Sequence, residues 1–201
     1  MKILAISGSP RKDGNTVILL NEALKGAQQE GAETELYSTS GKTIAPCDAC
    51  ISCRKTGRCH IDDDMQELYP KLREADGIII GTPIYHYTMA AQTKAIIDRT
   101  FSLDHNQVAL ANKVGGVVVV AASLGVLQAV KDLYFYFISM QMLPANFIAA
   151  YANAKGEAKN LEKCLIAARD LGRQMVLIAA KKFEYPKEIE SAKFGYGTWI
   201  K

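Results

Sequence analysis

The sequence predicts a doubly wound α/β domain, in which helices cover both faces of a five-stranded parallel sheet with the strand order 2-1-3-4-5. Three observations predict this fold. Short apolar runs alternate with helical patterns along the chain. The runs at 77–81 and 114–122 are apolar at nearly every position, as in strands that are buried on both faces. The first run stops abruptly at Ser7–Pro10, which is typical of a strand that meets a turn.

The expected elements follow one another without a second core or an internal repeat. Strands are expected at 2–6, 33–38, 77–81, 114–122 and 147–150. Helices are expected from Asn15 to Gly31, from Asp62–Asp64 to about Ala75, over 89–103, after the fourth strand to about Met142, and over 157–182. Asn15 or Thr16 would cap the first helix, and Gly31 would end it. Residues 1–183 would form one domain, and residues 184–201 a polar tail.

Composition and charge exclude several classes of function. The 201 residues carry a formal net charge of +3 and their Lys and Arg side chains are scattered, so we expect no nucleic-acid partner. No apolar stretch is long enough to span a bilayer, and the apolar run at 2–6 stops too early for a signal peptide. We therefore expect a cytoplasmic protein without a membrane partner, in which thiols stay reduced.

The turn after the first strand has the composition of an anion-binding loop. Residues 7–16 combine small residues, hydroxyl groups and Arg11, and they lead into a helix. Backbone N–H groups and the helix dipole face an anion at such a position. The spacing of Gly8 and Gly14 fits neither the G-x-G-x-x-G dinucleotide motif nor a P-loop. An ordinary strand–helix turn is the alternative.

Three segments resemble a known family. The run G-S-P-R-K-D-G-N-T at 8–16 is similar to the phosphate loop of the NAD(P)H-dependent FMN reductases and their iron–sulfur flavoprotein relatives, which are flavodoxin-like. T-P-I-Y-H at 82–86 resembles their flavin-ring loop, and Q-T-K-A-I-I-D-R at 92–99 resembles the helix that follows it. The resemblance covers most of residues 1–125 and implies a flavodoxin-like fold with FMN as cofactor.

The resemblance implies the FMN contacts residue by residue. The phosphate would be held by Ser9, Arg11, Asn15 and Thr16. The flavin ring would be lined by Pro83, Ile84, Tyr85 and His86, with Ser123 and Gly125 from the third flavin loop. His86 is either a proton donor or a loop residue whose backbone touches the flavin.

The third flavin loop departs from the family pattern. The reductases usually carry a glycine-rich stretch after the fourth strand, whereas this chain has Leu124, Val126 and Leu127 around one glycine. Glycine permits the close approach of a backbone, and bulky side chains do not. We therefore expect direct reduction by NAD(P)H to be slow compared with reduction by a low-potential one-electron donor.

The sharpest chemical signal is a run of four cysteines in the loop over 41–63. Cys47, Cys50, Cys53 and Cys59 have the spacing C-x2-C-x2-C-x5-C. Three thiolates at two-residue gaps can surround a compact cluster, and the fourth completes the set. Structural zinc and unligated thiols are the alternatives, although zinc sites of four cysteines usually form from two separated pairs. The spacing matches the compact motif of the iron–sulfur flavoproteins, and this resemblance implies a 4Fe–4S cluster.

Two further residues have simple interpretations. His60 follows Cys59 directly and is interpreted as a surface residue. Cys164 lies at apolar helical spacing with Leu161 and Leu165, which indicates a core thiol.

The leading hypothesis is an FMN-dependent redox protein that passes electrons between a 4Fe–4S cluster, FMN and an unknown acceptor. The two cofactors supply this chemistry, so we expect no indispensable side-chain nucleophile or general base. The alternatives are an NAD(P)H-dependent FMN or quinone reductase and a non-catalytic module stabilised by zinc. The expected electron donor is a ferredoxin-like protein or NAD(P)H.

A very apolar segment indicates self-association. Residues 130–142 form a helix that is apolar nearly all round, which favours burial on more than one side. We expect the outer side to face another subunit, with the anchors Tyr134, Tyr136, Phe137 and Met140. Cover from the aromatic tail is the alternative. The resemblance implies a homodimer or a homotetramer.

Overall fold

The computed structural model describes residues 1–104 and 109–185, and its sheet has the predicted topology. Five long strands pair in parallel in the spatial order β2-β1-β3-β5-β6, which is the predicted order 2-1-3-4-5. They are β1 (Lys2–Ser7), β2 (Glu33–Ser38), β3 (Gly77–Tyr85), β5 (Val114–Ala121) and β6 (Leu143–Tyr151). All five carboxyl ends lie at one edge, where ligands of doubly wound folds bind.

β3 continues past Gly81, where the prediction ended it, and turns back into the short antiparallel strand β4 (Thr88–Met89). Gly81 is a packing residue within the strand, because a Cβ there would lie 2.6 Å from Cδ1 of Leu20. The hairpin turns through His86 and Tyr87, whose φ angles are 49° and 72°. Such side chains disfavour left-handed backbone, so the surrounding structure imposes this turn.

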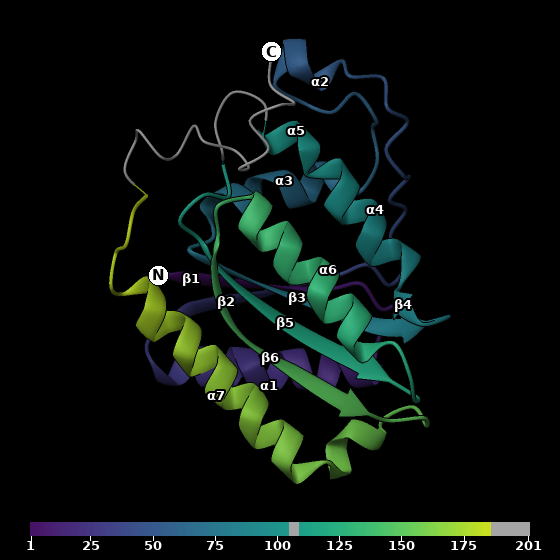
Figure 1. The fold of residues 1–201 in the computed structure, drawn as a ribbon, viewed down its shortest axis with the longest axis vertical. Coiled ribbons are helices and arrows are strands. Elements are labelled where there is room, and N and C mark those ends of the chain that lie inside the picture. The colour runs from purple at the N-terminus through teal and green to yellow at the C-terminus, as the bar shows by residue number, and fades with distance from the viewer. Residues whose placement is uncertain (105–108, 186–201) are drawn as a thin grey trace.

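Helices cover both faces of the sheet (Figure 1). α1 and α7 pack on the face that carries Ile3 and Ala5, whereas α3, α4 and α6 pack on the face that carries Leu4 and Ile6. Alternate residues of one strand thus enter opposite cores, which explains the continuous apolar runs. The helices are α1 (Asn15–Gln29), α2 (Cys53–Thr56), α3 (Met65–Glu74), α4 (Ala91–Arg99), α5 (Phe101–Asp104), α6 (Val126–Ser139) and α7 (Glu162–Ala179), with the 3-10 turn η1 (Glu157–Asn160).

α1 is held in place by direct backbone contact with α7. A Cβ on Gly26 would lie 1.9 Å from the carbonyl oxygen of Arg169, and one on Gly172 would lie 1.8 Å from that of Ala23. No larger side chain fits at either point unless the helices move apart. This contact fixes where the amino end of α1 stands at the carboxyl edge of the sheet.

Several helix boundaries differ from the prediction. The helix expected over 89–103 is split into α4 and α5 at Thr100, whose hydroxyl donates to the carbonyl of Ile97. The helix expected over 157–182 begins with η1, and α7 itself starts five residues later. Most of the expected tail, from residue 186 onward, lies outside the described residues. No helix in the described part of the chain is both long enough and apolar enough to cross a membrane.

α6 has one buried and one exposed side. Phe137 and Tyr136, two of the expected interface anchors, are 0% and 9% exposed and pack in the core of their own chain. The expectation that both face another subunit is wrong, because this side of the helix packs on the sheet. Leu127, Phe135 and Ile138 form the exposed side, and each is more than half exposed.

A buried ion pair ties the cysteine loop to the end of α4. The terminal nitrogens of Arg99, whose side chain is fully buried, donate to the Asp63 carboxylate at 2.8 and 3.1 Å. The same nitrogens donate to the carbonyls of Ala45 at 2.9 Å and Ile61 at 3.3 Å, one on each side of the cysteines. Asp63 also accepts from the N–H groups of Ala45 and Met65. Both ends of the loop therefore converge on one guanidinium.

Both members of this pair keep their charges although they are buried. Burial alone would raise the pKa of Asp63, but the bonds from Arg99 and from two backbone N–H groups hold it below its ordinary value. Burial would likewise lower the pKa of Arg99, yet its bonds to Asp63 keep that pKa raised. Both groups are therefore charged at neutral pH.

We expect Asp63→Asn to lower the free energy of unfolding by about 3–5 kcal/mol at neutral pH, because Arg99 then stays buried without a counter-charge. Stabilisation by a carboxyl with a depressed pKa is fully present above its unfolded pKa, about 3.9, and is lost as the pH falls through the folded value. The difference in the free energy of unfolding between the wild type and the variant should therefore become smaller in acid. Urea unfolding between neutral pH and about pH 3 measures it.

The exposed neighbour Asp62 provides a matched control, and Asp62→Asn should change the free energy of unfolding by less than about 0.5 kcal/mol. A deficit in Asp63→Asn that stays constant down to acid pH would contradict the ion-pair explanation.

Candidate functional site

Most of the expected FMN contacts line one cavity of about 210 Å³ at the carboxyl edge of the sheet. Its walls are formed by the loop after β1, the start of α1, the carboxyl ends of β3 and β5, and the residues that follow β5 and β6. The expected residues that line it are Ser9, Arg11, Asn15, Thr16, Pro83, Ile84 and Tyr85. His86, Ser123 and Gly125 lie outside this lining.

The part of this cavity that residues 9–16 form is rich in hydrogen-bond donors. No side chain caps α1, so the N–H groups of its first turn remain available to an anion. Ser9 and Thr16 are each only 2% exposed. The Ser9 hydroxyl accepts the N–H of Arg11 at 3.2 Å and folds the loop back on itself. This combination of backbone and side-chain donors fits a phosphate group.

The amide of Asn15 has a different role from the one expected. Its Nδ2 donates to the carbonyl of Ala154 at 2.9 Å, and its Oδ1 accepts the N–H of Ala158 at 3.1 Å. The expected capping of α1 by Asn15 or Thr16 is wrong, and Gly14 is the N-cap. The Asn15 side chain instead anchors the loop after β6, and what this residue can offer a phosphate is its backbone N–H.

Gly125 lets its loop pack closely against the backbone of the β3–β4 hairpin. A Cβ on Gly125 would lie 2.4 Å from the carbonyl oxygen of Tyr87, and its φ of 101° favours glycine. Tyr85 and Tyr87 on this hairpin are 43% and 60% exposed. The bulky Leu124 and Leu127 of the third flavin loop are even more exposed, at 70% and 78%. The exposed surface of these two loops is therefore aromatic and aliphatic.

The cysteines line a second cavity of about 600 Å³, between their loop and the carboxyl-terminal ends of α4 and α6. All four expected ligands, Cys47, Cys50, Cys53 and Cys59, belong to its lining. The opposite wall is formed by side chains that include Ile97, Arg99, Phe101, Tyr136 and Met140. Thiols on one wall and mainly apolar side chains on the other suit a compact cluster, with Cys47 and Cys50 exposed at its outer side.

The backbone around Cys50 is bent into an unusual shape. Ala49 and Ile51, which flank it, have φ angles of 58° and 61°. Left-handed backbone costs about 1–3 kcal/mol for such a residue and persists where the surroundings impose it. Left-handed residues alternating with right-handed ones turn N–H groups toward a common point, a geometry found at many iron–sulfur sites.

The four thiols interact, but they do not form a compact mononuclear set. The pKa of Cys53 is raised by burial and then by the nearby charges of Cys59, Cys50 and Cys47. In a tetrahedral zinc site with Zn–S bonds of about 2.3 Å, the sulfurs would lie about 3.8 Å apart. Among the described residues, no three of these sulfurs lie within 4.8 Å of one another. Each iron of a 4Fe–4S cluster takes one thiolate, so a cluster does not require the four sulfurs to meet at a single ion.

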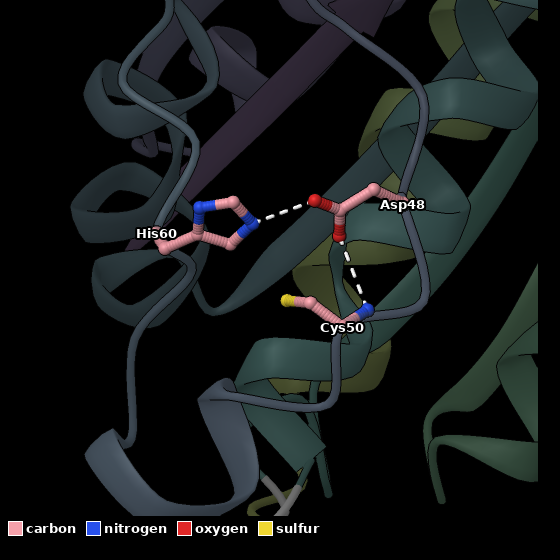
Figure 2. A group of neighbouring side chains, drawn as sticks. All are labelled: Asp48, Cys50 and His60. Atoms are coloured by element: carbon pink, nitrogen blue, oxygen red, sulfur yellow. Dashed lines mark hydrogen bonds and ion pairs between the residues drawn. The ribbon is translucent and has the colours of Figure 1, made fainter.

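Within the described ranges, the compact group that could hold a single ion consists of Asp48, Cys50 and His60 (Figure 2). His60 Nε2 lies 2.7 Å from Asp48 Oδ2, and Asp48 Oδ1 accepts the N–H of Cys50 at 3.2 Å. Bonds from Cys50 and then from His60 lower the pKa of Asp48. The imidazole and the carboxylate already bond each other, so Asp48 links His60 to the backbone of Cys50.

α4 separates the two cavities. It begins beside the first, where the N–H of Ala90 donates to the carbonyl of Pro83, and it ends at Arg99 in the second. Its nine residues span about 13 Å. In Figure 1 the loop after β2 runs along α4 to α2, away from the arrowheads of the strands. The loop does leave from the carboxyl edge as expected, but its cysteines lie at the other end of α4.

Sequence reasoning missed some residues of both cavities. Ala152 and Asn153 line the first cavity, and their signal was available because they directly follow β6 at the ligand-binding edge. Arg99 lines the second cavity. It belongs to the segment 92–99 that carries the family resemblance. Nothing in that segment indicates its contacts with Asp63 and Ala45, which lie 36 and 54 positions earlier in the sequence.

Comparison with known proteins identifies the family of this chain. Residues 1–155 match the family of NADPH-dependent FMN reductases. A protein of Methanocaldococcus jannaschii named an iron–sulfur flavoprotein is 40% identical over 185 residues, which cover 87% of this chain and 95% of that protein.

Solved structures share the fold at low sequence identity. RosB, whose structure holds 8-demethyl-8-formylriboflavin-5'-phosphate, matches with a TM-score of 0.77 and 18% identity, over 96% of this chain and 84% of that one. An archaeal flavodoxin matches with a TM-score of 0.59 and 17% identity, over 90% of this chain and 99% of that one. The fold is therefore flavodoxin-like. Since the family match spans most of the chain, this protein belongs to the NADPH-dependent FMN reductase family and is a flavin-dependent oxidoreductase.

Proposed function

We propose that this chain is an FMN-dependent electron-transfer enzyme that also carries a 4Fe–4S cluster on Cys47, Cys50, Cys53 and Cys59. The observation that carries the proposal is the presence of two separate cavities, one with donors for a flavin phosphate and one lined by four thiols. When bound, FMN supplies one- and two-electron chemistry and the cluster supplies one-electron chemistry. The side chains of the protein bind, orient and shield the two groups.

The first cavity would hold FMN by its phosphate. Ser9, Arg11 and Thr16 would contact the phosphate together with the N–H groups that open α1. The hairpin over 83–86 would line the ring. The imposed left-handed turn at His86 fixes its peptide groups, which favours backbone contact with the flavin over proton donation.

The separation of the cavities supports electron transfer between subunits. Within one chain, α4 lies between the two cavities and is about 13 Å long. The exposed side of α6 runs from the flavin edge at Gly125 toward Met140 in the cysteine cavity. In a two-fold contact whose axis is perpendicular to α6, the second copy of the helix is reversed, which would bring the cluster of one subunit toward the flavin of the other. We propose such a contact in a homodimer or homotetramer.

A cytoplasmic ferredoxin-like protein is the electron donor that this arrangement favours. A one-electron cluster accepts single electrons, and reduced thiols persist in the cytoplasm. Reduction by NAD(P)H is the second candidate, and the family match favours it. Neither a nucleic acid nor a membrane is proposed as a partner.

The double substitution Arg11→Ala and Thr16→Ala should weaken FMN binding about tenfold or more and leave riboflavin binding nearly unchanged, because only FMN carries the phosphate. Fluorescence titration of the flavin-free protein measures both affinities. Lys12→Ala removes a neighbouring exposed cation outside the cavity lining and should have little effect. Equal losses for the two flavins would show that the phosphate binds elsewhere.

Anaerobically purified protein should contain about four irons and four sulfides per chain, as one cluster on four thiolates requires. Cys59→Ser should lose both together. His60→Ala should keep them, although it destroys the compact group of Asp48, Cys50 and His60. One zinc and no sulfide, lost in His60→Ala but not in Cys59→Ser, would show that this compact group is the metal site instead.

NADPH should bleach the flavin slowly compared with a low-potential one-electron donor, because Leu124 and Leu127 crowd the side where a nicotinamide would stack. Anaerobic stopped-flow spectroscopy with each donor compares the two rates. Leu124→Gly should accelerate reduction by NADPH and leave the other rate unchanged. Rapid bleaching of the wild-type flavin at micromolar NADPH would instead favour an NAD(P)H-dependent FMN or quinone reductase as the function of this chain.

A further inference from the structure

We propose that Arg99 is a positioning residue for the cluster, which arranges the cysteine loop before any iron is bound. The proposal rests on the proposed cluster site and deepens it. Arg99 is not one of the ligands. It acts on them through the two ends of their loop and through the wall of their cavity.

The first observation is that one side chain closes the loop at both ends. Ala45 lies two residues before Cys47, Ile61 lies two residues after Cys59, and both carbonyls accept from Arg99. Bringing the ends of a flexible loop together costs conformational entropy. Because Arg99 and Asp63 fix these ends during folding, that cost is already met when the thiols bind iron.

The second observation is that hydrogen bonds hold both the chain at Arg99 and its guanidinium. The carbonyl of Arg99 accepts the hydroxyl of Tyr69 at 3.2 Å, and the hydroxyl of Tyr136 donates to that of Thr100 at 3.0 Å. Its planar head also bonds both oxygens of Asp63. A fork fixed in this way determines the position of the loop ends, which a single flexible ammonium group would not do.

The third observation points from Arg99 toward the cluster. Arg99 Nε is buried and has no hydrogen-bond partner among the described residues. Arg99 lines the same cavity as the four cysteines. A buried donor without an acceptor is unfavourable, and a sulfur held by the four cysteines would satisfy it if binding brings that sulfur against the wall at Arg99, whose side chain is 0% exposed. A hydrogen bond to a cluster sulfur stabilises the more negative reduced form and therefore raises the reduction potential.

The first test uses the protein without a cluster, so it does not depend on the proposed function. In Arg99→Lys, the amide of Ala45 should exchange its hydrogen about tenfold faster or more than in the wild type, because the geometry that holds it to Asp63 is lost. FMN affinity should stay unchanged, since the first cavity lies at the other end of α4. Lys94→Met removes an exposed charge from the same helix and should change neither quantity.

A second variant separates the loss of the ion pair from misfolding of the chain. The pair Arg99→Met and Asp63→Leu replaces the ion pair by apolar side chains, a change that buried pairs often tolerate. It should bind FMN normally and show the same rapid exchange at Ala45. Wild-type exchange at Ala45 in both variants would overturn the proposal.

The third measurement is the midpoint potential of the reconstituted cluster, which a merely structural role would leave unchanged. The potential should be lower in Arg99→Lys than in the wild type or in Lys94→Met. An unchanged potential in Arg99→Lys would overturn the assignment of Arg99 to the cluster. Failure of the wild type to take up iron would refute the cluster site itself and leave the exchange result intact.

Discussion

Every long strand of the sheet ends at the same edge, and each connecting helix runs back to the opposite one, so α4 has a flavin cavity at its start and a thiol cavity at its end. The positions of both cavities depend on these opposite directions of the strands and the helices. Gly26 and Gly172 hold α1 and its open N-terminus at the strand edge. The long loop after β2 then carries the cysteines along α4 to the other end. The two sites are therefore separate in one chain.

The second requirement is that a loop with little regular structure holds four cysteines in place. Apolar packing contributes little there, because Cys47 and Cys50 are exposed and Ile51 is 54% exposed. The loop is held instead by the buried pair of Arg99 and Asp63 at its ends. A buried ion pair is a poor source of net stability, but it specifies geometry when its remaining donors are used. Here those donors bond the carbonyls on both sides of the cysteines.

Local patterns were sufficient to predict the fold, because apolar periodicity and turn residues determine five parallel strands and their crossovers. The phosphate loop and the cysteine run were equally visible, since their residues are adjacent in the sequence. Three features depend on contacts between distant segments and could not be predicted in the same way. Asn15 bonds the backbone 139 and 143 residues later instead of capping its own helix. Phe137 faces the core because of how α6 packs on the sheet. Arg99 meets a loop whose path no local pattern indicates.

We propose that electrons pass from the cluster of one subunit to the flavin of another, and hybrid assemblies distinguish this route from transfer within one chain. Two differently tagged chains are co-expressed, one with Cys59→Ser and the other with Arg11→Ala and Thr16→Ala, and the mixed assembly is isolated anaerobically through both tags. Its only complete pair is a cluster on one chain and a flavin on the other. After rapid reduction of the cluster by a one-electron donor, electron transfer between subunits should bleach the flavin of the hybrid at close to the wild-type rate. A hybrid that contains both groups but shows no bleaching, while the wild type does, would contradict it.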